Sequence, residues 1–404
     1  MNVLCTQLGA RRNYQIPWQL HQTQQLSMLV TDFWNPLGGT VKFSGAWMPG
    51  VVKRAQSRFR EGIPSRKVRI SPKIAFEMIH YQKLGASGGE SFAQLSANFA
   101  RFTAKWVDRV EHDSMFAFCG AALEGLEREK RLGHTTVLDQ YDTGPELEKT
   151  IENEALRFKK LNQQVSKLPA SYYDRMREEW RLADRIHVNS SWTRESLLRS
   201  GIQFDKIAIV PLSYSKRLHK PEPRRHGGHN LRVLWFGRFC LGKGLAYAIE
   251  AARLACRLPI DFTFVGASLV DLNAVDWPGN CKVHPGLVHR EEVDSIYARS
   301  DVFLFPTLSD NFGGVQLEAM ANGLPVIATP CCGAVVEHGK SGFIVPPRDP
   351  QAIVEALEAL LEPGRLESMS AAACARVDEF STENIFPHFM RVFRMGLEST
   401  DIDM

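Results

Sequence analysis

The chain has 404 residues, and at about 100–200 residues per domain this length predicts two or three domains rather than one. Hydrophobic residues make up 44% of the chain and charged residues 23%, which is a globular composition that excludes disordered, collagen-like and disulfide-scaffold proteins. Residues 1–215 hold 30 Lys and Arg against 22 Asp and Glu, whereas residues 216–404 hold 19 against 23, so the first half is basic and the second is acidic.

The first predicted strand, Asn2–Gln7, ends in a turn that contains Gly9, Arg11 and Arg12. Arginine at the start of a helix is electrostatically unfavourable without an anion. The turn is therefore either a pair of exposed arginines or part of an anion site, and we favour the anion site.

A basic run follows between residues 53 and 73, where eight Lys and Arg face a single acid, Glu61. Such a run either binds an anionic membrane surface or a polyanion, or forms a solvated face. No nucleic-acid-binding motif accompanies it, so we expect no nucleic-acid partner. The basic residues are Lys53, Arg54, Arg58, Arg60, Arg66, Lys67, Arg69 and Lys73.

Short β-type runs alternate with helical patterns along the whole chain, which is typical of βα units and parallel sheets. The charged stretch 216–230, with two prolines and a glycine pair, is the predicted linker between two α/β halves, and ligands usually bind in the cleft between such halves. The further predicted strands of the first half are 68–70, 115–118, 135–138, 186–189 and 207–211, and its helices are 92–110 and 146–164. The predicted strands of the second half are 232–236, 261–265, 283–284, 302–305, 325–328 and 342–345, and its helices are 245–255, 291–299, 314–322 and 350–361.

The eight cysteines include no CxxC pair, and Cys331–Cys332 is their only close pair, so the sequence indicates neither a zinc site nor a disulfide framework. The N-terminus lacks the basic region of a signal peptide, and the longest uncharged stretches are too polar or too rich in Pro and Gly to span a membrane. We therefore expect a cytoplasmic protein with reduced, buried thiols.

The segment Trp235–Gly244 lies at a predicted strand-to-helix turn. Its glycines allow a tight, irregular turn. Arg238 and Lys243 bring two cations to one place, which suits a diphosphate whose charge grows as it leaves. The alternative is two surface charges beside a glycine turn. The segment is not a Walker loop, because the chain has no GxxxxGK[ST] sequence.

The strongest motif is Ser309–Ala328, in which a strand, a polar loop, two glycines and a helix follow one another. Backbone N–H groups at a helix start suit a phosphate, and a carboxylate one turn further suits a sugar hydroxyl pair. Asp310 in the loop and Glu318 on the helix are eight residues apart, so they suit the two ends of one ligand. The alternative makes Asp310 a solvated loop residue and Glu318 an ordinary helical acid.

In this order and spacing, the two motifs resemble retaining GT-B glycosyltransferases of glycosyltransferase family four, the glycogen synthase and mannosyltransferase-like group. That family has a G-R-x4-K-G turn and a Glu-x7-Glu element followed by A-M-A-x-G-x-P-V-I-A. The resemblance covers most of the second half and is weaker in the first, where it includes 188–201 and 209–211. It implies an α/β fold with two Rossmann-like domains that face a cleft.

The resemblance also implies a domain division: an acceptor-side domain at 1–215, a linker at 216–230, a donor-binding domain at 231–385 and a C-terminal helix at 386–404 that returns to the first domain. By position, it implies that Arg238 and Lys243 bind the donor diphosphate, Glu318 the ribose and Asp310 the transferred sugar. The phosphates would lie at Asn311, Phe312, Gly313, Gly314 and Val315, with Gly9 and His284 as further donor-binding residues.

Two positions depart from the family pattern. Asp310 replaces the first Glu of the Glu-x7-Glu element and is one methylene shorter. Asp139 stands where the family often has a histidine that touches the donor sugar. A carboxylate at that position can accept a sugar hydroxyl or the acceptor's proton, and the alternative is a helix cap at the end of a strand.

The implied function is transfer of a hexose from a nucleotide diphosphate sugar to an acceptor hydroxyl, with retention and without a metal or other cofactor. The expected acceptor is a saccharide or a lipid-linked saccharide, in polysaccharide or glycolipid biosynthesis at the inner face of the membrane. The alternatives are a non-catalytic nucleotide-sugar-binding protein with the GT-B fold, or another GT-B enzyme such as an epimerase or a phosphorylase.

Overall fold

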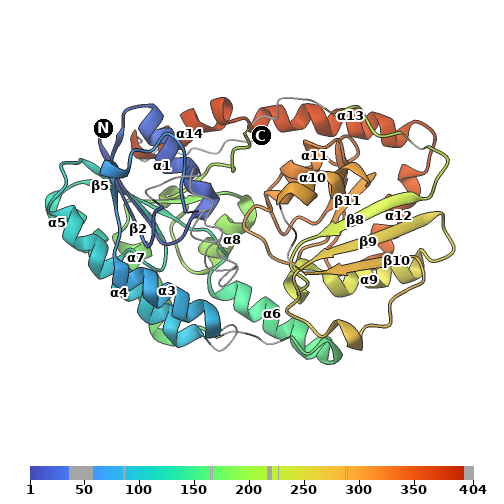
Figure 1. Ribbon diagram of the computed structural model, residues 1–404, viewed down its shortest axis with the longest axis horizontal. Coiled ribbons are helices and arrows are strands. Elements are labelled where there is room, and N and C mark those ends of the chain that lie inside the picture. The colour runs from blue at the N-terminus through green and yellow to red at the C-terminus, as the bar shows by residue number, and fades with distance from the viewer. Residues whose placement is uncertain are drawn as a thin grey trace.

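The computed structural model describes residues 1–35, 58–84, 88–163, 165, 167–215, 221–225, 227–286, 288 and 290–394. Lys53 and Arg54 of the basic run, part of the predicted linker 216–230 and the end of the predicted segment 386–404 lie outside the described residues. Figure 1 shows two α/β halves side by side, with helices on both faces of each sheet.

The described residues of the first half form a parallel sheet in the order β3-β2-β1-β4-β5-β6-β7. All residues of β1 and β4 are buried, because helices cover both faces of the sheet. The strands are β1 Val3–Gln7, β2 Leu26–Thr31, β3 Val68–Arg69, β4 Ser114–Phe118, β5 Thr135–Asp139, β6 Arg185–Val188 and β7 Ile207–Ile209. The helices are α1 Gln15–Gln22, α3 Pro72–Leu84, α4 Gly89–Val107, α5 Leu123–Leu132, α6 Pro145–Arg157, α7 Ala170–Leu182 and α8 Ser191–Arg199.

The second half repeats this plan with a parallel sheet in the order β10-β9-β8-β11-β12-β13. The strands are β8 Leu231–Phe236, β9 Ile260–Gly266, β10 Cys281–Pro285, β11 Val302–Phe305, β12 Val326–Ala328 and β13 Gly342–Ile344. The helices are α9 Leu245–Leu254, α10 Arg290–Ala298, α11 Val315–Met320, α12 Pro350–Leu360, α13 Arg365–Val377 and α14 Thr382–Arg394. The predicted α/β class with two Rossmann-like sheets is confirmed.

The predicted helix 146–164 is too long by about two turns. In the structure α6 ends at Arg157, and Phe158 leaves the helical region with φ −114° and ψ 51°. The Phe158 ring lies 5.5 Å from that of Tyr247 in an edge-on contact, and Leu161 is buried in the core of the second half. Packing on the second half therefore ends the helix before its helical sequence pattern does.

Both sheets have a topological switch point, where successive connections leave in opposite directions. It lies between β1 and β4 in the first sheet and between β8 and β11 in the second. In open parallel sheets, ligands bind outside the carboxyl ends of the strands at such points. The fold therefore provides one such place in each half.

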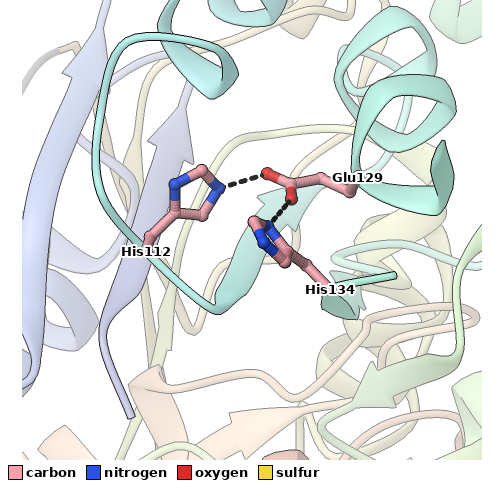
Figure 2. Close-up of side chains that lie close together, drawn as sticks. All are labelled: His112, Glu129 and His134. Atoms are coloured by element: carbon pink, nitrogen blue, oxygen red, sulfur yellow. Dashed lines mark hydrogen bonds and ion pairs between the residues drawn. The ribbon is translucent and has the colours of Figure 1, made fainter. Parts of the chain in front are cut away.

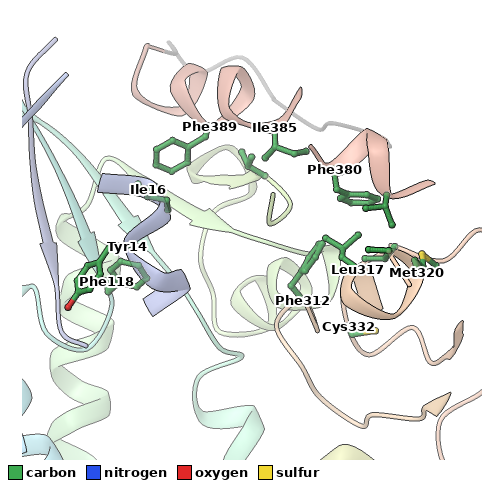
Figure 3. Packing of buried hydrophobic residues seen from close by; sticks show 14 of the residues in the cluster. Tyr14, Ile16, Phe118, Phe312, Leu317, Met320, Cys332, Phe380, Ile385 and Phe389 are labelled. Atoms are coloured by element: carbon green, nitrogen blue, oxygen red, sulfur yellow. The ribbon is translucent and has the colours of Figure 1, made fainter. Parts of the chain in front are cut away.

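The end of the chain crosses from the second half to the first. Phe380 lies 6.1 Å from the Phe312 ring in the second half (Figure 3). Phe389 of α14 lies 5.2 Å from the Phe116 ring of β4. One hydrophobic cluster includes residues of both sheets and of α14. The predicted domain boundaries stay predictions.

All eight cysteines are free thiols. No described helix combines the length and the apolar character that crossing a bilayer requires.

Candidate functional site

A cavity of about 340 Å³ lies between the two switch points. Its walls come from the carboxyl ends of strands in both sheets and from the loops that follow them. The lining residues of the first half are Arg11, Arg12, Phe118, Tyr141, Asn189 and Leu212. Those of the second half are Trp235, Phe236, Gly237, Lys243, Phe305, Asp310, Asn311, Phe312, Gly313, Gly314 and Val315.

The turn after β1 holds two arginines against the cavity. Arg12, Asn13 and Tyr14 have φ values of 51°, 48° and 55°, a left-handed conformation that non-glycine residues rarely adopt. The guanidinium carbon of Arg11 lies 3.4 Å from the centroid of the Tyr141 ring, so the face of the ring stabilises the positive charge of Arg11 through a cation–π interaction. The backbone strain therefore coincides with two cations that line the cavity.

Arg12 is fixed from behind by a buried network. Its Nη2 donates to Asp139 Oδ2 at 3.1 Å and to Asn189 Oδ1 at 2.5 Å, and His187 Nδ1 lies 2.5 Å from Asp139 Oδ1. Although burial by itself raises the pKa of the Asp139 carboxyl, the charges of Arg12 and His187 outweigh it and hold that pKa below its ordinary value. Asp139 is fully buried and is not among the residues that line the cavity.

The wall of the second half contains an ion pair between Lys243 and Asp310. The sequence predicts Lys243 at the donor diphosphate and Asp310 at the transferred sugar. Lys243 also lies 5.6 Å from the centroid of the Phe305 ring. Gly313, at φ 71°, has no room for a side chain, because a Cβ would lie 2.5 Å from the Phe305 ring. Gly313 therefore lies close to the cavity wall, and its carbonyl accepts the N–H of Gln316 at 2.9 Å, which begins the first turn of α11.

Asn311 joins this wall to the first half. Its Nδ2 donates to Asn189 Oδ1 at 2.8 Å, and its Oδ1 accepts from Thr193 Oγ1 at 2.6 Å. The neighbouring Ser309 hydroxyl lies 3.1 Å from that of Thr143. The loop before α11 thus contacts both halves, so its position depends on how the first half is oriented relative to the second.

Several predicted site residues lie outside this cavity. Gly9, at φ 89°, donates its N–H to Asp32 at 2.9 Å, and Arg238 is exposed. Glu318 is half-buried on α11 and accepts a hydrogen bond of 3.4 Å from the Tyr297 hydroxyl. His284 is exposed and lines a separate cavity of about 750 Å³ between β9, β10 and α10.

The sequence motifs assign no role to Tyr141, Asn189 and Thr193, although each lines the cavity or contacts a residue that does. A signal for the first two was available, because both follow strands and the carboxyl ends of parallel strands meet at one edge of the sheet. Thr193 lies inside α8, and its contact across the halves has no local signal.

Residues 230–363 match the family model described as glycosyl transferases group 1. Among curated proteins, the capsular polysaccharide biosynthesis glycosyltransferase CapM of Staphylococcus aureus is 28% identical over 50% of this chain and 54% of its own. The D-inositol 3-phosphate glycosyltransferase of Corynebacterium urealyticum is 39% identical over 26% of this chain and 25% of its own. The matches thus span about half or less of these relatives' length.

Solved structures match over nearly the whole chain. Anabaena Alr3699/HepE in complex with UDP is 16% identical, with a TM-score of 0.63, over 98% of this chain and 100% of that one. Sucrose-phosphate synthase from Thermosynechococcus elongatus is 17% identical, with a TM-score of 0.61, over 98% of each chain. At this identity, the likeness shows the fold.

Proposed function

Because this chain has the GT-B glycosyltransferase fold and its second half matches glycosyl transferases group 1, we propose that it transfers a hexose from a nucleotide diphosphate sugar to an acceptor hydroxyl, with retention. The observation that carries the proposal is the cavity at the two facing switch points. Cations from both halves, Arg11, Arg12 and Lys243, line it beside the loop of Asp310.

In the proposed donor pose, the diphosphate lies against Lys243 and the backbone of Gly313–Val315. The diphosphate competes with Asp310 for the ammonium group of Lys243, and the freed carboxylate accepts a hydroxyl of the transferred sugar. Arg238 approaches the diphosphate from the exposed side of its turn. Glu318 binds the ribose, farther along α11.

Arg11 and Arg12 complete the cation set from the acceptor side. We assign Asp139 a positioning role, since it is buried behind Arg12 and reaches the cavity through that guanidinium. Gly9 supports this turn through its hydrogen bond to Asp32. His284 lies in the neighbouring cavity, where we place the base of the nucleotide.

Asp310 is the one carboxylate among the described residues that line the cavity, and it pairs with Lys243. In the proposed donor pose this carboxylate accepts a hydroxyl of the transferred sugar, so we do not assign it the role of a covalent nucleophile. In the proposed reaction, the acceptor oxygen bonds to the anomeric carbon on the face from which the diphosphate leaves. The departing phosphate oxygen takes the acceptor's proton, which gives a glycoside and a nucleoside diphosphate.

Donor binding tests this pose. Isothermal titration with UDP-, GDP- and ADP-hexoses is expected to find at least one donor that binds, and Lys243→Ala should weaken it. Arg225→Ala, which removes an exposed cation of the same half that pairs with Glu367, is the matched control. Binding of no sugar nucleotide in the panel, or equal binding by Lys243→Ala, would contradict the pose.

We further propose that the acceptor is a saccharide or a lipid-linked saccharide at the cytoplasmic face of an anionic membrane. Lys73 and Arg66 are exposed, and the exposed Phe76 lies three residues after Lys73 on α3. Lys73 pairs with Glu77 at 3.8 Å on the surface of the same helix. The other described cations of the run are engaged within the fold. Arg58 pairs with Asp32, Arg60 lies over Trp18, Lys67 donates to the carbonyl of Leu26, and Arg69 lies over Trp106.

The membrane contact is tested with vesicles that contain acidic lipid at low salt. Each basic group near such a surface contributes about 1 kcal/mol, so Arg66→Gln with Lys73→Gln should reduce binding by roughly 30-fold. The matched control makes the same charge change in the second half, with Arg225→Gln and Lys340→Gln. Failure of the wild-type protein to bind the vesicles would identify the run as a solvated face.

A further inference from the structure

Two histidines and a glutamate meet at the end of the first sheet opposite the cavity (Figure 2). His112 directly precedes Asp113 and β4, His134 directly precedes β5, and Glu129 lies in the last turn of α5. His112 Nε2 lies 2.7 Å from Glu129 Oε1, and His134 Nδ1 lies 2.8 Å from Glu129 Oε2. Three segments thus point their ligand-type atoms at one place.

Hydrogen-bond chemistry requires a cation between His112 and Glu129. The Nδ1 of His112 lies 2.6 Å from the carbonyl oxygen of Val110, and because a carbonyl only accepts, Nδ1 must carry the proton. In a neutral imidazole, Nε2 would then present a lone pair to a carboxylate 2.7 Å away. A proton or a metal ion must therefore lie between them.

The same geometry is that of a metal-binding histidine. Ligating imidazoles usually donate their other N–H to a carbonyl or a carboxylate, which fixes the tautomer and the ring orientation. Two imidazoles and a carboxylate form a ligand set that suits Zn²⁺ rather than Mg²⁺, which prefers oxygen ligands. We propose that His112, Glu129 and His134 bind a zinc ion.

Only a small adjustment is needed for this coordination. Ligand atoms about 2.0–2.1 Å from a tetrahedral zinc ion lie roughly 3.3 Å from one another, so the two short contacts open by about half an ångström. The three ligand atoms lie within 4.8 Å of one another, and the widest of their separations closes toward the same value. The side chains of His112 and Glu129 are fully buried, whereas that of His134 is 25% exposed and provides the route of entry. Zinc takes the place of the proton between Nε2 and Oε1.

The expected effect is on stability rather than on transfer. The site joins the loop before β4, the end of α5 and the start of β5, all at the amino ends of the strands. The proposed donor cavity lies at their carboxyl ends. Zinc bound here holds three segments of the first half together without touching the donor.

The test uses the full chain after removal of metal with EDTA. Equilibrium dialysis against Zn²⁺, followed by metal analysis, should find a zinc ion that depends on His134, and zinc should raise Tm. In His134→Ala, affinity should fall by more than the 10–100-fold that loss of an outer-shell partner alone causes. His80→Ala, which changes an exposed histidine of α3, is the matched control.

Cobalt(II) provides a second measurement on the same variants. The wild-type protein and His80→Ala should show the visible absorption of tetrahedral cobalt, and His134→Ala should lose it. Zinc binding that is equal in wild type and His134→Ala, or the absence of zinc binding and of a Tm shift, would overturn the proposal. The latter result would identify the cluster as a proton-held ion pair.

Discussion

At the scale of single residues, two of the cations in the proposed site form ion pairs with carboxylates of the same chain. Lys243 is held by Asp310, and Arg12 is held by Asp139 and Asn189, so none of these groups stands alone before the donor arrives. The two pairs differ in burial. Lys243 and Asp310 are partly exposed and can exchange partners, whereas Asp139 is fully buried and keeps its own.

The first prediction separates the two acids of the motif 309–328. Glu318→Gln should weaken both the free nucleoside diphosphate and the sugar donor, since we place Glu318 at the ribose that the two ligands share. Asp310→Asn should weaken the sugar donor alone. Titration of both ligands into both variants measures the contrast, and equal effects on both ligands would refute the two-ended arrangement.

The second prediction concerns pH. Because the pKa of Asp139 is held below its ordinary value in the folded protein, its ionised form contributes stability above about pH 4, and this stability is lost as the pH falls through the folded pKa. Asp139→Asn breaks a buried charge pair and should lower the free energy of unfolding by about 3–5 kcal/mol at pH 7.

Urea unfolding of both proteins between pH 3 and pH 8 checks the sign. The difference between wild type and Asp139→Asn should shrink as the pH falls below about 4. A difference that persists unchanged at pH 3 would mean that Asp139 is not ionised in the fold.

At the scale of elements, the sequence predicted what depends on local pattern. Strand β11 is a continuous apolar run and is found at the predicted residues 302–305. Strand β2 was missed because it lies in a stretch rich in Gln, His and Thr, and α6 was predicted too long because its end is set by contact with Tyr247.

The candidate site was predictable to a similar degree. The glycines and the charges of the second half occur at fixed spacing, so Lys243, Asp310 and Gly313 could be found, and all three line the cavity. The partners of Asp139 could not be found, because Arg12 is 127 residues away in sequence and no local pattern encodes that pair.

A prediction at this scale concerns the loop before α11. Gly313→Ala introduces a Cβ at a left-handed residue and against Phe305, and should destabilise the fold by about 1–3 kcal/mol and weaken donor binding. Gly339 has nearly the same φ, 76°, but open space around it, so Gly339→Ala isolates the cost of the backbone conformation. Equal loss of stability in the two variants would show that contact between a Cβ at residue 313 and the Phe305 ring adds no cost.

At the scale of the whole molecule, the cavity exists because two similar halves face each other. Asn311 contacts Asn189 and Thr193 across it, while Gln15 near the N-terminus donates to Ser213 at 2.7 Å and to Thr382 of α14 at 3.3 Å. The helix α14 then packs on the first sheet, so contacts at several points fix how the halves meet. The proposed transfer needs this arrangement, because donor and acceptor must meet between the two halves.

The most direct test is release of nucleoside diphosphate from a hexose donor in the presence of saccharide acceptors, followed together with glycoside formation. We expect turnover by the wild-type protein with retention of anomeric configuration. Lys243→Ala should reduce turnover by about 100–1000-fold with little change in folding, and Arg238→Ala should reduce it as well, since each removes a charge that stabilises the leaving diphosphate. Donor binding without any turnover would identify a nucleotide-sugar-binding protein. Donor conversion without acceptor would identify an epimerase. Wild-type turnover by Lys243→Ala would contradict the proposed site.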